Sequence, residues 1–343
     1  VHLFCMRLRS SSVPYVWAAR HERFEAFLEG HVRAFDWLGG VSENLVYDNL
    51  TTAVRKVLSG HDRELQERFI TLRSHYLFQS VFCNIRSGNE KGSVENLVGY
   101  VRRNALTPVP SVDSMAELNN DVLLGWCRKE QQRLQADWLV EKASLRAIPE
   151  GVYKPCISVI LPVNKLSLVT YERNRYSIPT RYISLNVRMD AYTDRLDMWY
   201  QDQLIARHQR RYGRNHTSLQ LEHYLDALAL KPYAVNNAVV VRELPEPYQQ
   251  ARKFLCGSSQ SGYREFVRIL LLHKEFPAQQ VRAAVADRLT AGRLTADEVR
   301  QVILNQRAVK RFSGAVVAPD MMAQIQVPVG KPTLYDELTG VEA

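Results

Sequence analysis

Two carboxylates stand where the sequence pattern could bring them together. Asp48 directly follows a short apolar run, Leu45-Val46-Tyr47, which predicts a buried strand, and Glu95 stands near the start of a predicted helix at 91–104. An acid at the carboxyl end of a strand and an acid on a neighbouring helix can meet at a sheet edge, where divalent cations find hard oxygen ligands. Two Mg²⁺ or Mn²⁺ ions held there can activate a water or a 3′-hydroxyl and stabilise the leaving oxygen of a phosphoryl transfer.

Each acid also has an ordinary structural explanation. An Asp after a strand forms turns, and a Glu in the first turn of a helix compensates the helix dipole. Glu95 is harder to explain as a solvated charge, because it borders an apolar stripe that comprises Val94, Leu97, Val98 and Val101. The pattern alone therefore leaves both explanations open and makes Asp48 and Glu95 candidate catalytic metal ligands. Lys91, just before the Glu95 turn, is a candidate contact to substrate phosphate.

The elements that must position these acids follow from the hydrophobic periodicity. In chain order they are strands at 1–8 and 13–18, a helix at 20–38 that stops at Gly39-Gly40, a strand at 45–47, a helix at 65–76, a strand at 78–83 and a helix at 91–104. Such an α/β alternation predicts a mixed sheet with helices packed on it.

The rest of the chain changes character twice. A charged helical stretch at 114–146 precedes Pro149-Glu150-Gly151, after which short strands with period-two alternation indicate a small β-barrel. Helical pieces split by prolines follow from Ser218 onward. We therefore predict five parts, namely an α/β core at 1–110, a helical connector at 111–150, a β-barrel at 151–215, a helical C-terminal region at 216–306 and a flexible tail at 307–343.

Composition narrows the function classes. The 343 residues include 45 Lys and Arg against 36 Asp and Glu, a net charge of +9 that favours binding to a polyanion. Five widely spaced cysteines with no CxxC pair indicate neither a disulfide framework nor a zinc site. No apolar run is long enough to span a bilayer, which predicts a cytoplasmic protein without membrane contact. The sequence contains no P-loop motif, so we expect that the chain does not hydrolyse ATP itself.

Three basic segments are candidate DNA contacts. The first is a run without acids at the predicted barrel exit, which comprises Arg207, His208, Arg210, Arg211, Arg214 and His216. The second places Arg173 and Arg175 among tyrosines that could stack on distorted DNA. The third comprises Lys91, Arg102 and Arg103. Two of them have an alternative explanation. The basic run could be a solvated linker, and the tyrosines could be half-buried packing residues.

Several motifs carry a family resemblance. They are Tyr47-Asp48-Asn49-Leu50-Thr51-Thr52-Ala53-Val54, Leu72-Arg73-Ser74-His75-Tyr76-Leu77-Phe78, Gly88-Asn89-Glu90-Lys91-Gly92-Ser93-Val94-Glu95, Asn174-Arg175-Tyr176-Ser177-Ile178-Pro179 and Leu204-Ile205-Ala206-Arg207-His208. In this order they resemble the integrase core and β-barrel of IstA-type insertion-sequence transposases. The resemblance implies an RNase H-like α/β core, a Mu-transposase-like barrel and a helical C-terminal region.

The resemblance also implies a catalytic triad of two aspartates and one glutamate, with the second Asp at Asp48 and the Glu at Glu95. The first Asp is expected on a strand before Val1, and the family's N-terminal helix-turn-helix before that, so the chain is predicted to be an N-terminally truncated and inactive piece. The implied reaction is two-metal DNA 3′-end processing and strand transfer. The implied partners are transposon-end and target duplex DNA, further copies of the chain and an IstB-type AAA+ ATPase, in the bacterial cytoplasm and on the nucleoid.

Two alternatives remain open at this point. The chain could be a catalytically inactive DNA-binding or assembly remnant, which an Asp on the preceding strand would argue against. It could also be a retroviral-type integrase, although the long helical region after the barrel counts against that interpretation.

Overall fold

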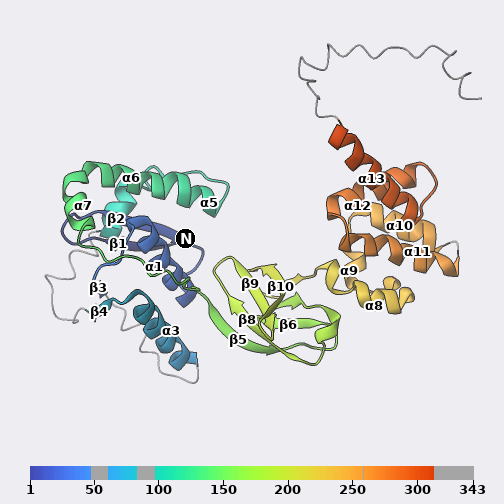
Figure 1. The fold of residues 1–343 in the computed structure, drawn as a ribbon, viewed down its shortest axis with the longest axis horizontal. Coiled ribbons are helices and arrows are strands. Elements are labelled where there is room, and N and C mark those ends of the chain that lie inside the picture. The colour runs from blue at the N-terminus through green and yellow to red at the C-terminus, as the bar shows by residue number, and fades with distance from the viewer. Residues whose placement is uncertain (48–60, 83–96, 258, 313–343) are drawn as a thin grey trace, which may run out of the picture. The chain divides into compact units, whose positions relative to one another are not determined.

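A computed structural model describes residues 1–47, 61–82, 97–257 and 259–312. The chain divides into two compact units, Val1–His223 and Tyr224–Ala343. Figure 1 shows the α/β elements, the connector and the β-rich part of the first unit, and the helices of the second.

The first unit begins with the predicted hairpin. Strands β1 (His2–Arg7) and β2 (Pro14–Ala19) pair antiparallel, with His2 opposite Ala19. Strands β3 (Asn44–Tyr47) and β4 (Gln79–Phe82) pair parallel. The expectation of one mixed sheet is wrong for the described part of the chain, because β1 and β3 share no hydrogen bonds and the strands form two separate pairs.

Helix α1 (Phe24–Leu38) joins the two strand pairs into one core. It ends, as predicted, at Gly39, whose φ of 68° is a left-handed conformation that glycine adopts without a Cβ penalty. Leu28 and Phe35 of α1 pack in one cluster with Tyr47 of β3 and with residues of α3 (His61–Tyr76). A helix described over 97–104 buries Leu97 and Val101 against β2, as the apolar stripe predicts.

The predicted connector is helical and packs on β2. It consists of α5 (Met115–Glu117), the π-helical turn η1 (Leu118–Leu123), α6 (Leu124–Arg133) and α7 (Gln135–Lys142). Ser114 caps α5 by accepting a hydrogen bond from the backbone N–H of Glu117. Leu123 and Cys127 are fully buried in the cluster that contains Val16 and Ala18 of β2.

The β-rich part consists of two sheets around one core. Strands β5 (Ile157–Pro162), β8 (Asn186–Ala191), β9 (Arg195–Tyr200) and β10 (Gln203–Gln209) form one sheet in the order β10-β9-β8-β5. Strands β6 (Leu168–Tyr171), β7 (Asn174–Ser177) and β11 (Thr217–Ser218) form the other in the order β11-β7-β6. Residues of both sheets are buried together, including Val169, Tyr176, Met189 and Met198.

Strand pairing among the described residues thus does not close the expected small β-barrel, which consists of two sheets instead. The spacing of Ile183 and Leu185 predicts that they alternate within a strand, but both residues lie outside the strands. They lie instead after the 3₁₀ turn η2 (Thr180–Tyr182), on either side of Ser184, whose φ is 65°. Backbone pairing nevertheless continues at this point, because the N–H of Ser184 donates to the carbonyl oxygen of Val163 at 3.0 Å and the N–H of Val163 donates to the carbonyl oxygen of Leu185 at 2.9 Å.

The second unit is helical, as predicted. Its α-helices are α8 (Leu225–Leu230), α9 (Val239–Arg242), α10 (Glu246–Cys256), α11 (Gln260–Leu271), α12 (Ala278–Thr290) and α13 (Ala296–Phe312). Helix α13 extends past the predicted boundary at 306, and the rest of the expected tail, 313–343, lies outside the described residues. Within the described chain, no helix is long and apolar enough to cross a membrane.

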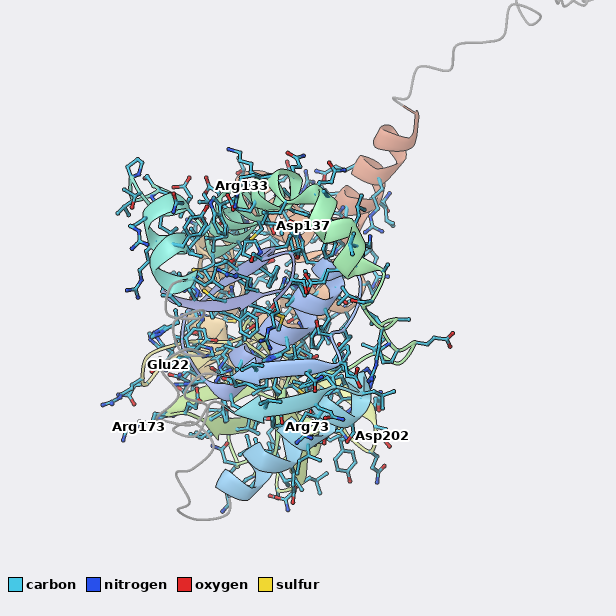
Figure 2. All side chains as sticks on the ribbon, turned by 90° about the vertical axis from the view of Figure 1, so that its left-hand side faces the viewer. Glu22, Arg73, Arg133, Asp137, Arg173 and Asp202 are labelled. Atoms are coloured by element: carbon cyan, nitrogen blue, oxygen red, sulfur yellow. The ribbon has the colours of Figure 1, made fainter. Side chains whose placement is uncertain are left out.

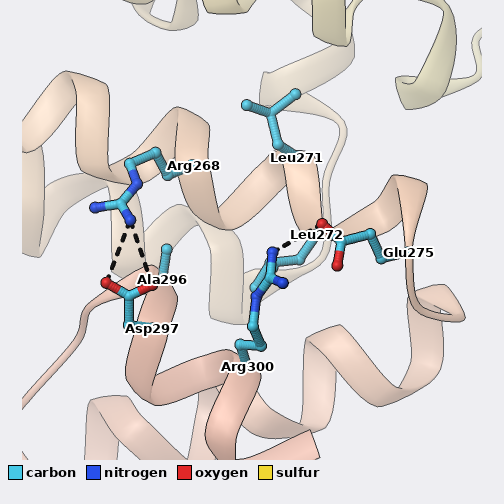
Figure 3. A pocket seen from close by; sticks show the side chains of 7 residues that line it. All are labelled: Arg268, Leu271, Leu272, Glu275, Ala296, Asp297 and Arg300. Carbon is cyan, nitrogen blue, oxygen red and sulfur yellow. Dashed lines mark hydrogen bonds and ion pairs between the residues drawn. The ribbon is translucent and has the colours of Figure 1, made fainter.

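A small pocket of about 200 Å³ opens between helices of this unit. Two ion pairs line it. Arg268 contacts Asp297 at 3.2 Å and Arg300 contacts Glu275 at 2.7 Å, as Figure 3 shows. Because each cation in the pocket already has a carboxylate partner, the pocket offers little free charge to a ligand.

Candidate nucleic-acid interface

The predicted catalytic acids Asp48 and Glu95, and Lys91 beside them, lie outside the described residues. Among the residues that are described, no group of three or more His, Cys, Asp or Glu side chains could hold a metal ion. The two-metal prediction therefore stays a prediction.

The backbone just before Asp48 is firmly anchored. Tyr47 ends β3, and its hydroxyl lies 2.9 Å from Nε2 of His31 on α1. Nδ1 of His31 lies 2.8 Å from the carbonyl oxygen of Phe27, which can only accept, so Nδ1–H donates there and Nε2 accepts from Tyr47. Burial lowers the pKa of His31 to about 4, so the ring is neutral near pH 7.

A basic surface forms along β7. Arg173 and Arg175 are exposed, whereas Asn174 and Tyr176 between and after them are buried. Arg175 lies on β7 itself, and Arg173 lies in the β6–β7 turn directly before it. Arg173 lies at the margin of the molecule in Figure 2.

Buried Asn174 holds a second basic segment against this strand. Its Nδ2 donates to the carbonyl oxygens of Arg211 at 3.0 Å and Gly213 at 3.3 Å, and its Oδ1 accepts from the backbone N–H of His216 at 3.0 Å. The backbone N–H of Asn215 donates to the carbonyl of Arg173 at 2.9 Å. The loop 211–216 is thereby fixed beside β7.

This arrangement gathers four of the predicted DNA contacts, which we call the basic edge: Arg173, Arg175, Arg211 and Arg214. All four are exposed, and none forms an ion pair with any described residue. Guanidinium groups on β7, in the turn before it and in the loop beside it, without a carboxylate partner in the described part of the chain, are suited to phosphate oxygens.

Three other members of the predicted basic run are paired or buried. Arg207 is exposed but donates from Nε and Nη2 to Asp197 at 2.7 and 3.0 Å. The side chain of Arg210 is fully buried and pairs with Glu25 at 2.7 Å, so its assignment as a DNA contact is wrong. His208 is 1% exposed and contacts the carbonyl oxygen of Ser177 at 2.7 Å.

A signal for this burial is present in the sequence. Ala206, His208 and Arg210 are buried and alternate with exposed residues, continuing the period of β10 beyond its end. The alternation predicts that every second residue of the basic run is buried, whereas net charge alone predicts that the whole run is exposed. Tyr176 and Tyr182 near β7 are packing residues, since they are only 1% and 7% exposed.

The third predicted basic segment is described in part. Arg102 and Arg103 are exposed on the helix over 97–104. They belong to the α/β part, whereas the basic edge belongs to the β-rich part.

Comparisons with known proteins point to DNA transposition. Residues 148–220 match the family described as Mu transposase, C-terminal domain. This match covers the two β-sheets and the whole basic edge.

Similarity to named relatives extends over most of the chain. It is 32% identical over 295 residues to the transposase for insertion sequences IS1326/IS1353 of Pseudomonas aeruginosa, covering 82% of this chain and 58% of the relative. It is 30% identical over 332 residues to a transposase of Aminobacter aminovorans, covering 93% of this chain and 65% of that protein. The transposase for insertion sequence element IS21 of Pseudomonas aeruginosa is 27% identical over 207 residues, covering 57% of this chain and 52% of its own length.

The chain thus spans less than two thirds of the length of these relatives. The resemblance drawn from the motifs is confirmed: this chain is similar to insertion-sequence transposases over most of its length.

Proposed function

We propose that this chain is part of a DNA transposase and that the basic edge binds the phosphate backbone of duplex DNA. The observation that carries the proposal is the position of four exposed arginines, which form no ion pair with a described residue, within residues 148–220, the segment similar to the Mu transposase C-terminal domain. Contacts to phosphate fix a protein on a duplex without reading its sequence. The proposed ligand is therefore duplex DNA of any sequence, including transposon ends and target.

We also propose that residues 1–110 belong to an RNase H-like core of the DDE type. The antiparallel pair β1–β2, helix α1 and the parallel pair β3–β4 support this fold. A further strand between β1 and β3 would join the two pairs into one sheet and would carry the first Asp of the triad. Protection of β1 and β3 amides from hydrogen exchange, once the upstream segment is supplied, tests this proposal.

Asp48 and Glu95 would then hold two Mg²⁺ or Mn²⁺ ions, and their assignment rests on the sequence motifs. When bound, the ions would supply activation of the attacking water or 3′-hydroxyl and stabilisation of the leaving oxygen. The contribution of the described residues is positional: the Tyr47–His31 hydrogen bond holds the end of β3, and the basic edge would hold DNA.

The partners belong to the same proposal. We expect the chain to act as a homo-oligomer with an IstB-type AAA+ ATPase, on the bacterial nucleoid. These expectations rest on the resemblance to IstA-type transposases that the sequence motifs carry.

The direct experiment measures DNA affinity against salt. Binding of a duplex of arbitrary sequence is titrated by fluorescence anisotropy between about 50 and 200 mM salt, for the native chain and for the variant R173Q/R175Q/R211Q/R214Q. The slope of log K against log salt is negative, and removing one arginine–phosphate interaction makes it less steep by about 0.9. The quadruple variant should therefore show a much flatter slope and bind at least tenfold more weakly at the lowest salt.

A charge-matched control separates this site from net charge. The variant R133Q/R268Q/R288Q/R300Q removes four arginines that already pair with carboxylates. It should keep the native slope. Equal decreases of affinity in both variants would show that net charge alone attracts DNA, and the basic edge would not be a site.

A further inference from the structure

A buried ion-pair cluster joins helix α1 to the β-rich part within the first unit. We call Glu25, Glu172 and Arg210 the clamp. Nη1 of Arg210 donates to Glu25 at 2.7 Å, and its Nη2 donates to both carboxylate oxygens of Glu172 at 3.2 Å. The side chains of Arg210 and Glu25 are 0% and 1% exposed. The three residues come from α1, the β6–β7 turn and the segment after β10, so the clamp connects three distant parts of the sequence.

The clamp residues stand directly beside the basic edge. Glu172 precedes Arg173 in the two-residue turn between β6 and β7, where both have positive φ values of 49° and 65°. Arg210 precedes Arg211. Two clamp residues lie in the β-rich part: Arg210 is buried and Glu172 is half-buried. Each is followed in the chain by an exposed arginine of the basic edge. Moving either clamp residue would move its neighbour.

The start of α1 makes further contacts with the same region. Arg23 forms an ion pair with Glu172, and the carboxylate of Glu29 accepts from the hydroxyl of Thr193. The exposed residue Glu22, next to Arg23, and the exposed Arg173 are both labelled in Figure 2. The first two turns of α1 thus face the β6–β7 turn and the segment before β9.

A neutral histidine completes the junction. Nδ1 of His21 accepts from the backbone N–H of Arg23 at 3.2 Å, so its proton is on Nε2, which donates to the hydroxyl of Tyr212 at 2.7 Å. That hydroxyl in turn donates to the carbonyl of Thr193. Burial and the nearby Arg210 lower the pKa of His21 to about 4, so no extra positive charge competes with the clamp near pH 7.

A buried charge cluster is a costly way to hold two parts together. Desolvating the ions offsets much of their attraction, and well-packed apolar residues often stabilise as much or more. What the guanidinium of Arg210 adds is direction, because its donors have fixed positions in one plane and here donate to two different carboxylates. The cluster is better explained by the orientation it imposes than by stability.

We propose that Glu25, Glu172 and Arg210 are positioning residues that fix the basic edge relative to helix α1, so that bound DNA lies in one orientation against the α/β core. This inference rests on the proposed function of the basic edge. It assigns no direct DNA contact to the clamp.

The test compares how tightly and where DNA binds. A photo-crosslinker is attached to a cysteine at position 22 (Glu22→Cys), whose native side chain is 86% exposed. The yield and position of crosslinks to a labelled duplex are measured in this background with Glu25→Gln or Glu172→Gln. Glutamine keeps the size and an acceptor oxygen while removing the charge. Glu67→Gln on α3 is the control, because Glu67 is exposed and makes no ion pair with a described residue.

The expected result separates affinity from orientation. Both clamp variants should bind DNA within about twofold of the control with an unchanged salt slope, because the four arginines remain. Their crosslinks should fall at least fivefold at the native position or spread along the duplex, and Glu25→Asp should restore part of the native pattern. Native crosslinks in a folded Glu172→Gln chain would overturn the proposal, as would a decrease of affinity that matches the decrease of crosslinks.

Should Glu25→Gln fail to fold, Glu172→Gln decides, because Glu172 is 29% exposed and less costly to neutralise. Failure of the proposed function has a different signature. In that case R173Q/R175Q/R211Q/R214Q would bind DNA as the native chain does, whatever the clamp variants show.

Discussion

The side-chain amide of Asn119 pairs with the backbone of Ala18 as a neighbouring strand would. Its Oδ1 accepts from the Ala18 N–H at 2.7 Å, and its Nδ2 donates to the Ala18 carbonyl at 2.9 Å. Asn119 lies in the π-helical turn η1, whose extra residue per turn places it against β2. One side chain therefore satisfies both backbone groups at this point of the β2 edge.

Asn119→Leu should destabilise the first unit by about 2–3 kcal/mol, because two hydrogen bonds are removed and the backbone groups of Ala18 are left unpaired. The stability of Asn119→Asp should lie between those of the native chain and Asn119→Leu, since a carboxylate accepts from the Ala18 N–H but cannot donate to the Ala18 carbonyl. Urea unfolding followed by amide exchange at Ala18 measures the effect. The control Asn120→Leu changes an exposed neighbour and should stay within about 0.5 kcal/mol of the native chain.

Stability of the first unit should fall as the pH decreases from about 6.5 toward 4. Burial lowers the pKa of His31 and of His223 to about 4, and lowers that of His208. Their unfolded-state pKa is about 6.5. Stability is therefore complete above that value and is lost as protons bind the unfolded chain first, at up to about 1.4 kcal/mol per pH unit for each ring.

His31→Phe tests one of these rings. It should lower stability at pH 7, because Tyr47 and Phe27 lose their partner, yet flatten the decline between pH 6.5 and 5. Exposed His216→Phe is the matched control and should leave the slope unchanged. An acid slope that survives in His31→Phe would assign the pH dependence to other groups.

Catalysis should require both proposed acids. In a chain that includes the upstream segment, Asp48→Asn or Glu95→Gln should abolish Mg²⁺-dependent strand joining and leave DNA binding within about twofold. The reason is that the metal site would serve chemistry while the basic edge serves affinity. Joining is measured with pre-cut transposon ends on a plasmid target. Full joining by Glu95→Gln would contradict the assignment, as would robust joining by residues 1–343 alone.

Two glycines should respond to alanine in opposite directions. A Cβ at Gly262 would lie 1.9 Å from the carbonyl oxygen of Leu255, where α11 crosses the end of α10. Gly262→Ala should therefore destabilise the second unit by more than about 2 kcal/mol, because backbone must shift. A Cβ at Gly125 in α6 meets nothing within 4 Å, so Gly125→Ala should stabilise the first unit by about 0.5–1 kcal/mol. Thermal unfolding of both variants measures the contrast.

Local patterns in the sequence determined most of the elements. The hairpin of β1 and β2, the stop of α1 at Gly39 and the helices after Ser218 could be predicted because period, caps and turns are encoded within a few neighbouring residues. The family resemblance came the same way, from short motifs in a fixed order. Element ends were less certain, as α13 shows by continuing to Phe312.

Only the tertiary structure decided which charges are free. Arg210 and Arg211 are neighbours of identical type, yet one is buried against Glu25, 185 positions away in sequence, and the other is exposed beside β7. The split of the strands into separate sheets likewise depends on which distant backbones meet. Pairing over such separations depends on packing of the whole core, and no local pattern carries it.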